Sequence, residues 1–351
     1  MLPAFLSSID MTKKVLVIGG GIAGMTAASS LAESGLHVDL IEKKDHLGGH
    51  VHRWDRLFPS FRPGDEVTGF LENKIDRRIS LHTNANIQGI VHLHDEFVVL
   101  LENDEEISGN AIILATGYEL FDAAKKEEYG YGIYDNVITS AELEDRFKAK
   151  GRFTNSKDKV PDRIAFIHCV GSRDEKVGNL YCSKVCCVTG VKQAIEIKEL
   201  LPSSEVFCFY MDLRMFDRNF EELYFEAQQK WGINFIRGRL SECAENPDHS
   251  IVLKTEDTLT GRPLKMTVDL MVLLVGFVPS PETMKISTML GLQKGVDGFL
   301  KPEDEHLRDN DTVVPGVFIA GAVKGPSCIV NTIADARSTA LQVVAYLKSK
   351  E

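Results

Sequence analysis

The sequence lacks several patterns that would place it in a familiar class. Its longest apolar run, Leu270 to Val278, is too short to span a bilayer. It has no internal repeat, no low-complexity tract, no C-x2-C pair and no C-x2-C-x2-C-x3-C-P run. The first ten residues have neither a basic start nor a long apolar stretch. We therefore expect no signal peptide, no membrane span and no proximal dithiol of the thioredoxin type.

Composition narrows the class further. A chain of 351 residues with 44% hydrophobic and 26% charged residues is typical of a soluble protein with two domains. The net charge of -11 disfavours nucleic acid or an acidic membrane as a partner. Seven cysteines, mostly clustered, fit a reducing compartment such as the cytoplasm. We expect the charge runs at Lys125–Glu128 and Gly151–Lys159 to be solvated surface.

A glycine-rich turn opens the ordered pattern. The β-branched run Lys14–Ile18 precedes the glycine run Gly19–Gly24, and a helical pattern continues through Ser34. The apolar run His37–Ile41 then ends on Glu42. This order of strand, G-x-G-x-x-G, helix, strand and acid predicts a dinucleotide-binding βαβ unit.

Each residue of this motif has a physical role. Gly19 permits the tight turn, Gly21 lets the backbone approach a pyrophosphate, and Gly24 lets helix and strand pack closely. The helix N-terminus offers N–H donors and a partial positive charge to the phosphates. Glu42 can accept hydrogen bonds from a ribose diol.

Three further motifs indicate which dinucleotide binds. Leu47 to His50 contains a second glycine pair, Ala115-Thr116-Gly117 follows an expected strand, and Gly321-Ala322 follows another strand before a last helix at about Ile329–Leu347. The set resembles the FAD domain of the glutathione-reductase and thioredoxin-reductase superfamily, which implies non-covalent FAD. That superfamily usually has an aspartate where this chain has Ala322.

The resemblance also implies which residues contact FAD. Asn331 and Thr332 would face the flavin pyrimidine. The complete set of expected cofactor-binding residues is Gly19, Gly21, Ile22, Ala23, Gly24, Glu42, Lys43, Gly48, Gly49, Ile87, Ala115, Thr116, Gly117, Gly276, Gly321, Ala322, Asn331 and Thr332.

Four cysteines crowd the middle of the chain. Cys169, Cys182, Cys186 and Cys187 have the spacing C-x12-C-x3-C-C. Soft thiolates suit zinc or an iron–sulfur cluster. Two adjacent cysteines reach separate corners of a cuboidal cluster more easily than one metal ion. Buried free thiols, a disulfide and zinc remain the alternatives.

The cysteines follow the first strand of a second α/β pattern. A nicotinamide site would need G-x-G-x-x-G directly after the expected strand Arg163–Ile167, but His168 and Cys169 stand there. This argues against direct oxidation of NAD(P)H. The other elements expected in this region are strands at Glu205–Tyr210, Ile233–Arg237, Ile251–Lys254 and Pro263–Asp269 and a helix at Phe220–Lys230.

From Val15 onward, the chain resembles the A subunit of heterodisulfide reductase. The cysteine stretch, Met211–Arg214, Glu221–Arg239 and Gly316–Ala340 carry the resemblance. It implies that the four cysteines ligate a 4Fe-4S cluster close to FAD. It also implies that Lys192, five residues after the last cysteine, lies near the flavin N5 and favours the reduced, anionic flavin.

The fold class that we expect is α/β, with two Rossmann-like domains. Residues 11–120 and 276–351 would form a discontinuous FAD-binding domain, and residues 121–275 an inserted domain that resembles an NAD domain and carries the cluster. The short chain is similar to the heterodisulfide-reductase-like form of sulfur-oxidising bacteria. That implies an FAD and 4Fe-4S electron-transfer protein of sulfur metabolism, with homologues of the B and C subunits as partners and a possible homodimer.

Three other functions stay open. One is the flavoprotein component of a quinone-interacting oxidoreductase. Another is a self-sufficient NAD(P)H-dependent disulfide or ferredoxin reductase. The third is a non-catalytic assembly module. Cys208, Cys243 and Cys328 are expected to be core or local thiols, and Cys328 is the one nearest to an expected flavin-facing helix.

Overall fold

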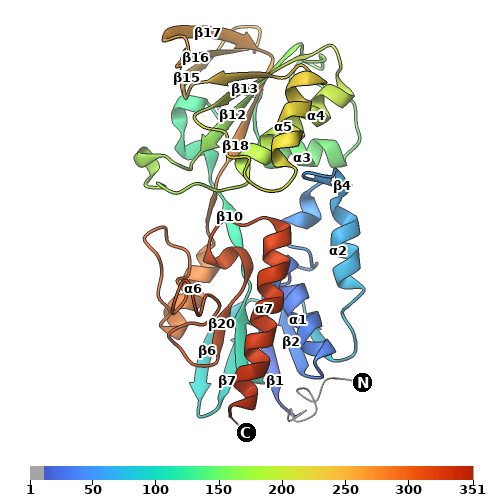
Figure 1. The fold of residues 1–351 in the computed structure, drawn as a ribbon, viewed down its shortest axis with the longest axis vertical. Helices are drawn as coiled ribbons and strands as arrows, with labels where there is room; N and C mark the ends of the chain where they lie inside the picture. Colours follow the sequence, from blue (N-terminus) through green and yellow to red (C-terminus); the bar gives the residue numbers. More distant parts are fainter. Residues whose placement is uncertain (1–11, 351) are drawn as a thin grey trace. The chain divides into compact units, whose positions relative to one another are not determined.

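The computed structural model describes residues 12–350 and divides into two compact units. The first unit comprises residues up to His52, Gly64–Glu119 and Val278 onward, and the second comprises Arg53–Pro63 and Leu120–Phe277. The chain passes between them at β10 (Tyr118–Leu120) and β19 (Phe277–Pro279), and also at the two ends of residues 53–63. Figure 1 shows the two units in sequence colours.

The first unit is built on a parallel sheet in the order β20-β9-β1-β2-β5. Its strands are β1 (Lys14–Ile18), β2 (His37–Ile41), β5 (Ile79–His82), β9 (Ala111–Leu114) and β20 (Val317–Ile319). The strands β1, β9 and β20 are almost entirely buried. Continuous apolar runs of this kind are typical of parallel strands that are covered on both faces.

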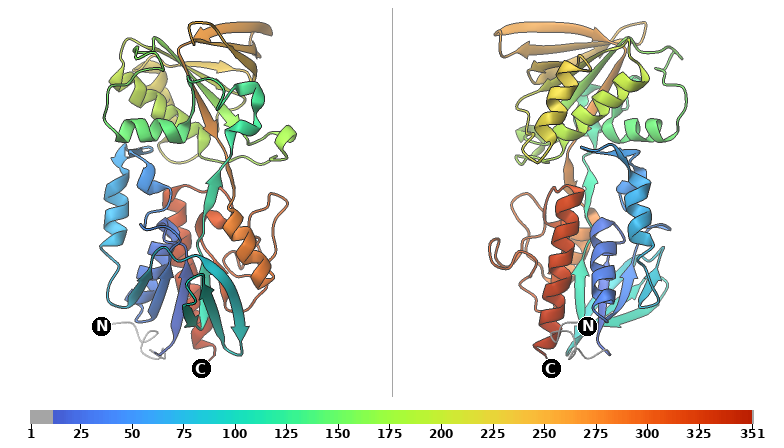
Figure 2. Two further views of the ribbon diagram at one scale, coloured as in Figure 1. Left: turned by 180° about the vertical axis from the view of Figure 1, so that it is seen from behind. Right: turned by 45° about the vertical axis from the view of Figure 1, so that its right-hand side comes forward.

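Helices and a smaller sheet cover this parallel sheet. The helices are α1 (Ile22–Glu33), α2 (Gly64–Glu72), α6 (Pro281–Leu290) and α7 (Ile329–Lys348). Figures 1 and 2 show α1 and α7 side by side. The antiparallel sheet consists of β6 (Ile87–Leu93), β7 (Glu96–Leu101) and β8 (Glu106–Gly109).

The second unit repeats the layered plan with a parallel sheet in the order β11-β18-β12-β13-β14. Its strands are β11 (Val137–Thr139), β12 (Arg163–Val170), β13 (Glu205–Tyr210), β14 (Asn234–Arg237) and β18 (Leu270–Val275). Its helices are α3 (Ser140–Lys148), α4 (Cys186–Leu200) and α5 (Phe220–Gln229). The expected α/β class with two Rossmann-like domains is confirmed.

Two small sheets complete the second unit. The antiparallel sheet contains β15 (Leu240–Glu245), β16 (Ile251–Asp257) and β17 (Arg262–Val268). A short hairpin contains β3 (Arg56–Leu57) and β4 (Arg62–Pro63). The structure places residues 53–63, which contain this hairpin, in the second unit. The sequence pattern assigns them instead to the FAD domain.

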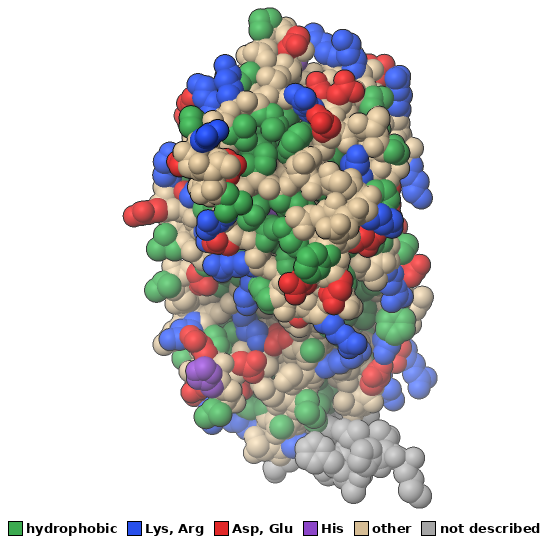
Figure 3. All heavy atoms as spheres, turned by 45° about the horizontal axis from the view of Figure 1, so that its top comes forward, with side chains coloured by type: hydrophobic (Ala, Val, Ile, Leu, Met, Phe, Trp, Pro, Cys, Tyr) green, Lys and Arg blue, Asp and Glu red, His purple; other side chains and the backbone are tan. Residues whose placement is uncertain are grey.

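One expectation about surface charge was wrong. Lys126, in a run expected to be solvated, is only 2% exposed. Its ammonium lies 2.8 Å from carboxylate oxygens of both Glu128 and Asp174. A buried cation needs such partners to offset its desolvation. Elsewhere, acidic and basic side chains are interspersed on the face in Figure 3. Among residues 12–350, no helix combines the length and the apolar character needed to cross a bilayer.

Candidate functional site

The glycine turn between β1 and α1 leaves one side of its backbone open. A Cβ on Gly24 would lie 1.7 Å from the Gly19 carbonyl oxygen, and a Cβ on Gly19 would lie 2.4 Å from the Ala115 carbonyl oxygen. A Cβ on Gly21 would meet nothing closer than the Gly49 Cα, 3.8 Å away. Gly19 and Gly24 therefore serve the packing of the turn, whereas Gly21 leaves room for a ligand at the start of α1.

The second glycine pair lies against this turn. The Gly48 N–H donates to the Gly20 carbonyl at 2.9 Å, and a Cβ on Gly49 would lie 3.2 Å from the Gly21 Cα. Gly48 and Gly49 have φ values of 96° and 57°, a region that favours glycine. The fold thus joins two glycine motifs that are separate in the sequence.

Glu42 follows β2 and is 7% exposed. Its carboxylate accepts the Gly20 N–H at 2.6 Å and the Lys44 N–H at 2.8 Å. The side chain therefore braces the glycine turn itself, a role that the sequence pattern does not reveal. Lys43 points elsewhere, with its ammonium 3.1 Å from Glu282 and 3.6 Å from Glu119.

The C-terminal motif also reaches this turn. A Cβ on Gly321 would lie 2.7 Å from the Ala23 Cβ, beside Ile22 at the start of α1. Thr332 is buried near Gly321, and Asn331 is exposed on α7. The Gly321 N–H donates to Asp335 at 2.6 Å. Asp335, which sequence reasoning missed, thus contacts the loop in which Ala322 replaces the usual aspartate.

Other expected cofactor residues lie at the ends of strands. Ala115 to Gly117 follow β9, and the Thr116 hydroxyl contacts the Thr283 hydroxyl at 2.6 Å. Ile87 opens β6 and is buried. Gly276 is the exception, since it lies in the second unit, where a Cβ would meet the Ser172 Oγ at 2.4 Å.

The four clustered cysteines line one pocket in the second unit. Cys169 lies near the end of β12, Cys182 lies in the following loop, and Cys186 and Cys187 form the first turn of α4. The pocket is small and partly open to solvent. Its remaining lining residues are Ser172, Arg173, Ser183, Lys184, Asp212 and Arg214.

The backbone around this pocket is unusual. Cys169, Arg173 and Lys184 have φ values of 61°, 52° and 56°. Residues other than glycine seldom adopt this left-handed region, and such residues gather at ligand sites. All three lie in the segments that carry the cysteines, and eight other non-glycine residues with positive φ lie elsewhere in the described part of the chain.

Burial affects the protonation of these thiols. Desolvation raises the pKa of Cys187 to about 12, and it raises the pKa of Cys186 well above its usual range. Without a metal these cysteines are therefore neutral thiols, whereas metal binding requires and stabilises thiolates. Arg173, Lys184 and Arg214 line the pocket against one acid, Asp212, so the surroundings favour an anionic group.

The positions of the four thiols can be compared with the needs of a single metal ion and of a cluster. Among residues 12–350, no three His, Cys, Asp or Glu side chains are arranged to hold one metal ion. The four thiols nevertheless share one pocket. A cuboidal cluster takes one thiolate at each iron and so spreads its ligands more widely than a single ion does. The donor set, the pocket and the cations fit such a cluster.

Lys192 lies on α4 and is only 2% exposed. It is not a solvated helix residue, which is how its sequence context alone would be read. Its ammonium lies 2.5 Å from Glu144 and 2.8 Å from Glu196. Neither acid was singled out from the sequence, because α3 and the helical spacing that bring them to Lys192 are visible only in the fold.

Comparisons with known proteins agree with this architecture. Residues 17–76 match the family model of an NAD(P)-binding Rossmann-like domain, and residues 187–340 match that of pyridine nucleotide-disulphide oxidoreductase. The fold is similar to thioredoxin reductase of T. acidophilum (TM-score 0.67, 19% identity, covering 97% of this chain and 100% of that one). It is also similar to that of Lactococcus lactis (TM-score 0.65, 21% identity, 96% and 100%).

Sequence relatives are more specific. The A subunit of H(2):CoB-CoM heterodisulfide,ferredoxin reductase from Methanothermobacter thermautotrophicus is 33% identical over 96% of this chain. The iron-sulfur A subunit of CoB-CoM heterodisulfide reductase from Methanocaldococcus jannaschii is also 33% identical, over 95%. The chain spans 64% of the length of each relative. Over nearly its whole length the chain is therefore similar to the A subunits of heterodisulfide reductases, and its family matches are those of an oxidoreductase.

Proposed function

We propose that the chain is the FAD and 4Fe-4S electron-transfer component of a cytoplasmic, heterodisulfide-reductase-like complex in sulfur metabolism. The observation that carries the proposal is the pocket lined by Cys169, Cys182, Cys186 and Cys187 and by three cations. Thiols scattered through a core would not share one pocket. FAD would exchange two electrons, and the cluster would pass them singly to a partner.

The first unit would hold FAD at its glycine turn. Gly21 leaves the backbone open for the pyrophosphate, and the N–H groups at the start of α1 would donate to it. Glu42 holds the turn through Gly20 and would keep its remaining lone pairs for the ribose. In the second unit, Lys192 would carry a fixed positive charge that favours the reduced flavin, as the family resemblance implies.

The partners would be homologues of the B and C subunits, and a homodimer is also possible. Because the sequence has no C-x2-C pair, the disulfide or sulfane-type substrate would be handled on another protein of the complex.

A redox experiment on anaerobically prepared protein tests the proposal. We expect dithionite to bleach the flavin and the broad cluster absorption, and low-temperature electron paramagnetic resonance to show a reduced cluster. NADH should bleach neither rapidly, because His168 and Cys169 stand at the end of β12 in place of a nicotinamide-binding turn. A flavin that dithionite cannot reduce would contradict an electron-transfer role.

A second candidate is the NAD(P)H-dependent reductase. The match to the pyridine nucleotide-disulphide oxidoreductase model over residues 187–340 favours it. It predicts rapid bleaching of the flavin by NADH in the absence of any partner protein, so the same titration distinguishes the two functions. A quinone-interacting flavoprotein would instead pass electrons from the reduced protein to a quinone only when its partners are present.

A further inference from the structure

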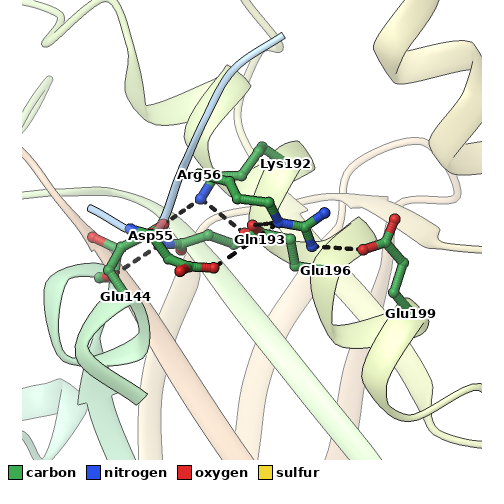
Figure 4. Close-up of polar contacts among 8 residues, drawn as sticks. Asp55, Arg56, Glu144, Lys192, Gln193, Glu196 and Glu199 are labelled. Atoms are coloured by element: carbon green, nitrogen blue, oxygen red, sulfur yellow. Dashed lines mark hydrogen bonds and ion pairs between the residues drawn. The ribbon is translucent and has the colours of Figure 1, made fainter. Parts of the chain in front are cut away.

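A network of buried charges surrounds Lys192 in the second unit (Figure 4). Its ammonium contacts Glu144 of α3 and Glu196 of its own helix, and the side chains of these two acids are 4% and 1% exposed. Arg56 of β3 joins the network, with its Nε 2.9 Å from Glu196 Oε1 and its Nη2 2.6 Å from Glu199. Arg56 and Glu199 are about one-third exposed and connect the network to solvent.

The charges in this network do not balance. Three carboxylates, Glu144, Glu196 and Glu199, face two cations, Lys192 and Arg56, which leaves one negative charge in excess. The Asp55 carboxylate, 4.0 Å from the Arg56 Nε and partly exposed, adds to that excess. An uncompensated charge in a buried site is costly and is commonly removed by binding a proton.

The two buried carboxylates, Glu144 and Glu196, do not accept the same number of hydrogen bonds. Glu144 accepts from the Lys192 ammonium at 2.5 Å, the Gln193 amide at 2.7 Å and the Asp55 N–H at 3.1 Å. Glu196 accepts one aligned hydrogen bond, from Arg56 to Oε1. Its Oε2 lies 2.8 Å from the Lys192 ammonium but has no hydrogen bond of good geometry. Glu196 is therefore the less stabilised of the two buried carboxylates as an anion, and the one that gains more from binding a proton.

Electrostatics agrees with this assignment. Desolvation raises the pKa of Glu196 to about 7, against the opposing attraction of Lys192 and with the help of Glu144. Lys192 and Glu199 face Glu196 from α4, Glu144 faces it from α3, and Arg56 faces it from β3. The protonation of Glu196 thus responds to small changes of local charge near neutral pH.

The same helix connects Glu196 to the cysteine pocket. Cys186 and Cys187 form the first turn of α4, and Glu196 follows on the third turn. A rise of about 1.5 Å per residue places the two sites about 15 Å apart along the helix axis. Most of α4 is buried, so a charge at its start is weakly screened at Glu196.

We propose that Glu196 is a charge-compensating proton site for the redox centre at the start of α4. When that centre accepts an electron from a low-potential donor, the Glu196 carboxylate binds one proton from solvent, and it releases this proton when the centre is reoxidised. No other bond forms or breaks. The inference rests on the proposed function, because it requires a redox centre in the cysteine pocket.

Redox-difference infrared spectroscopy tests this directly. Anaerobic protein with measured FAD and iron is reduced with dithionite at a pH about one unit above the Glu196 pKa of about 7. We expect the carbonyl band of a protonated carboxylic acid to appear on reduction and to shift when the protein contains ¹³C-labelled glutamate. Glu196→Gln should abolish the band, and the control Glu226→Gln, on α5 outside the network, should keep it.

The potential of the centre gives a second measurement. Its midpoint should fall with increasing pH around neutrality in the wild type and in Glu226→Gln, and less steeply in Glu196→Gln. A protein that holds iron and FAD but shows no glutamate band, or shows the same band in Glu196→Gln, overturns the inference alone. If Glu196→Gln does not fold, the absence of a glutamate band in the wild type still overturns the inference. If the protein contains no iron, the proposed function itself is contradicted, and the inference falls with it.

Discussion

At the scale of single residues, the four clustered cysteines differ from the other three in their surroundings. Cys169, Cys182, Cys186 and Cys187 share a pocket with Arg173, whereas Cys208, Cys243 and Cys328 do not line it. The raised pKa values of the buried thiols mean that a metal must displace protons to bind there. Without a bound metal, these buried cysteines would therefore remain protonated and unreactive thiols.

Replacing a single clustered cysteine should remove the metal group. We expect Cys186→Ser or Cys187→Ser to lose the broad visible absorption and the bound iron, because serine is a poor ligand for iron–sulfur clusters, while FAD largely stays. Cys243→Ser, on β15 outside the pocket, is the matched control. Unchanged iron in both pocket variants would refute the assignment of these ligands.

Lys192 should affect both the flavin and the fold. Lys192→Ala removes the positive charge, so the reduction potential of the flavin should fall. It also leaves Glu144 and Glu196 buried without their shared cation, which should cost about 3–5 kcal/mol of unfolding free energy. Lys192→Arg should recover part of both. Potentiometry and chemical denaturation measure the two effects, and an unshifted potential would leave Lys192 with a structural role only.

At the scale of elements, different glycines of the turn between β1 and α1 serve the packing of the turn and the binding of a ligand. A Cβ on Gly24 would collide with the Gly19 carbonyl, whereas a Cβ on Gly21 has open space. Gly21→Ala should therefore keep the thermal stability of the cofactor-free protein but lose FAD. Gly24→Ala should unfold the turn and lower the melting temperature even without cofactor. Equal FAD retention in Gly21→Ala and the wild type, measured after gel filtration, would contradict the location of the pyrophosphate.

The sequence predicts local elements better than their contacts. The regular apolar patterns of β1, β2 and β13 indicate the two Rossmann-like sheets, and the glycine spacing indicates the turn. The segment Glu106–Gly109 forms strand β8 because it pairs with β7. Its polar residues give no strand signal without that partner.

Long-range partners account for most of what could not be predicted. Lys126 and Lys192 resemble surface residues in the sequence, but each pairs with a distant acid, Asp174 or Glu144, as well as with a nearby one. Asp335 contacts Gly321 across 14 residues of sequence. Pairing of this kind depends on tertiary geometry, whereas periodicity reports only which face of an element is apolar.

On the scale of the whole molecule, Glu196 should make stability depend on pH. Its pKa in the folded protein, about 7, is above the ordinary glutamate value of 4.5. The folded state therefore binds more protons than the unfolded state between these values, and stability falls as pH rises through that window. Relative to Glu196→Gln, the wild type should lose up to about 1.4 kcal/mol of unfolding free energy per pH unit there. Parallel profiles from denaturant titrations would contradict the raised pKa.

The central claim is that one chain carries both FAD and an iron–sulfur cluster. The most direct test is the content of iron, acid-labile sulfide and FAD per chain in anaerobically prepared protein. The four cysteines that line one pocket predict about four irons and about four sulfides for each FAD. Flavin without iron and sulfide would leave the cysteines as thiols and contradict the account.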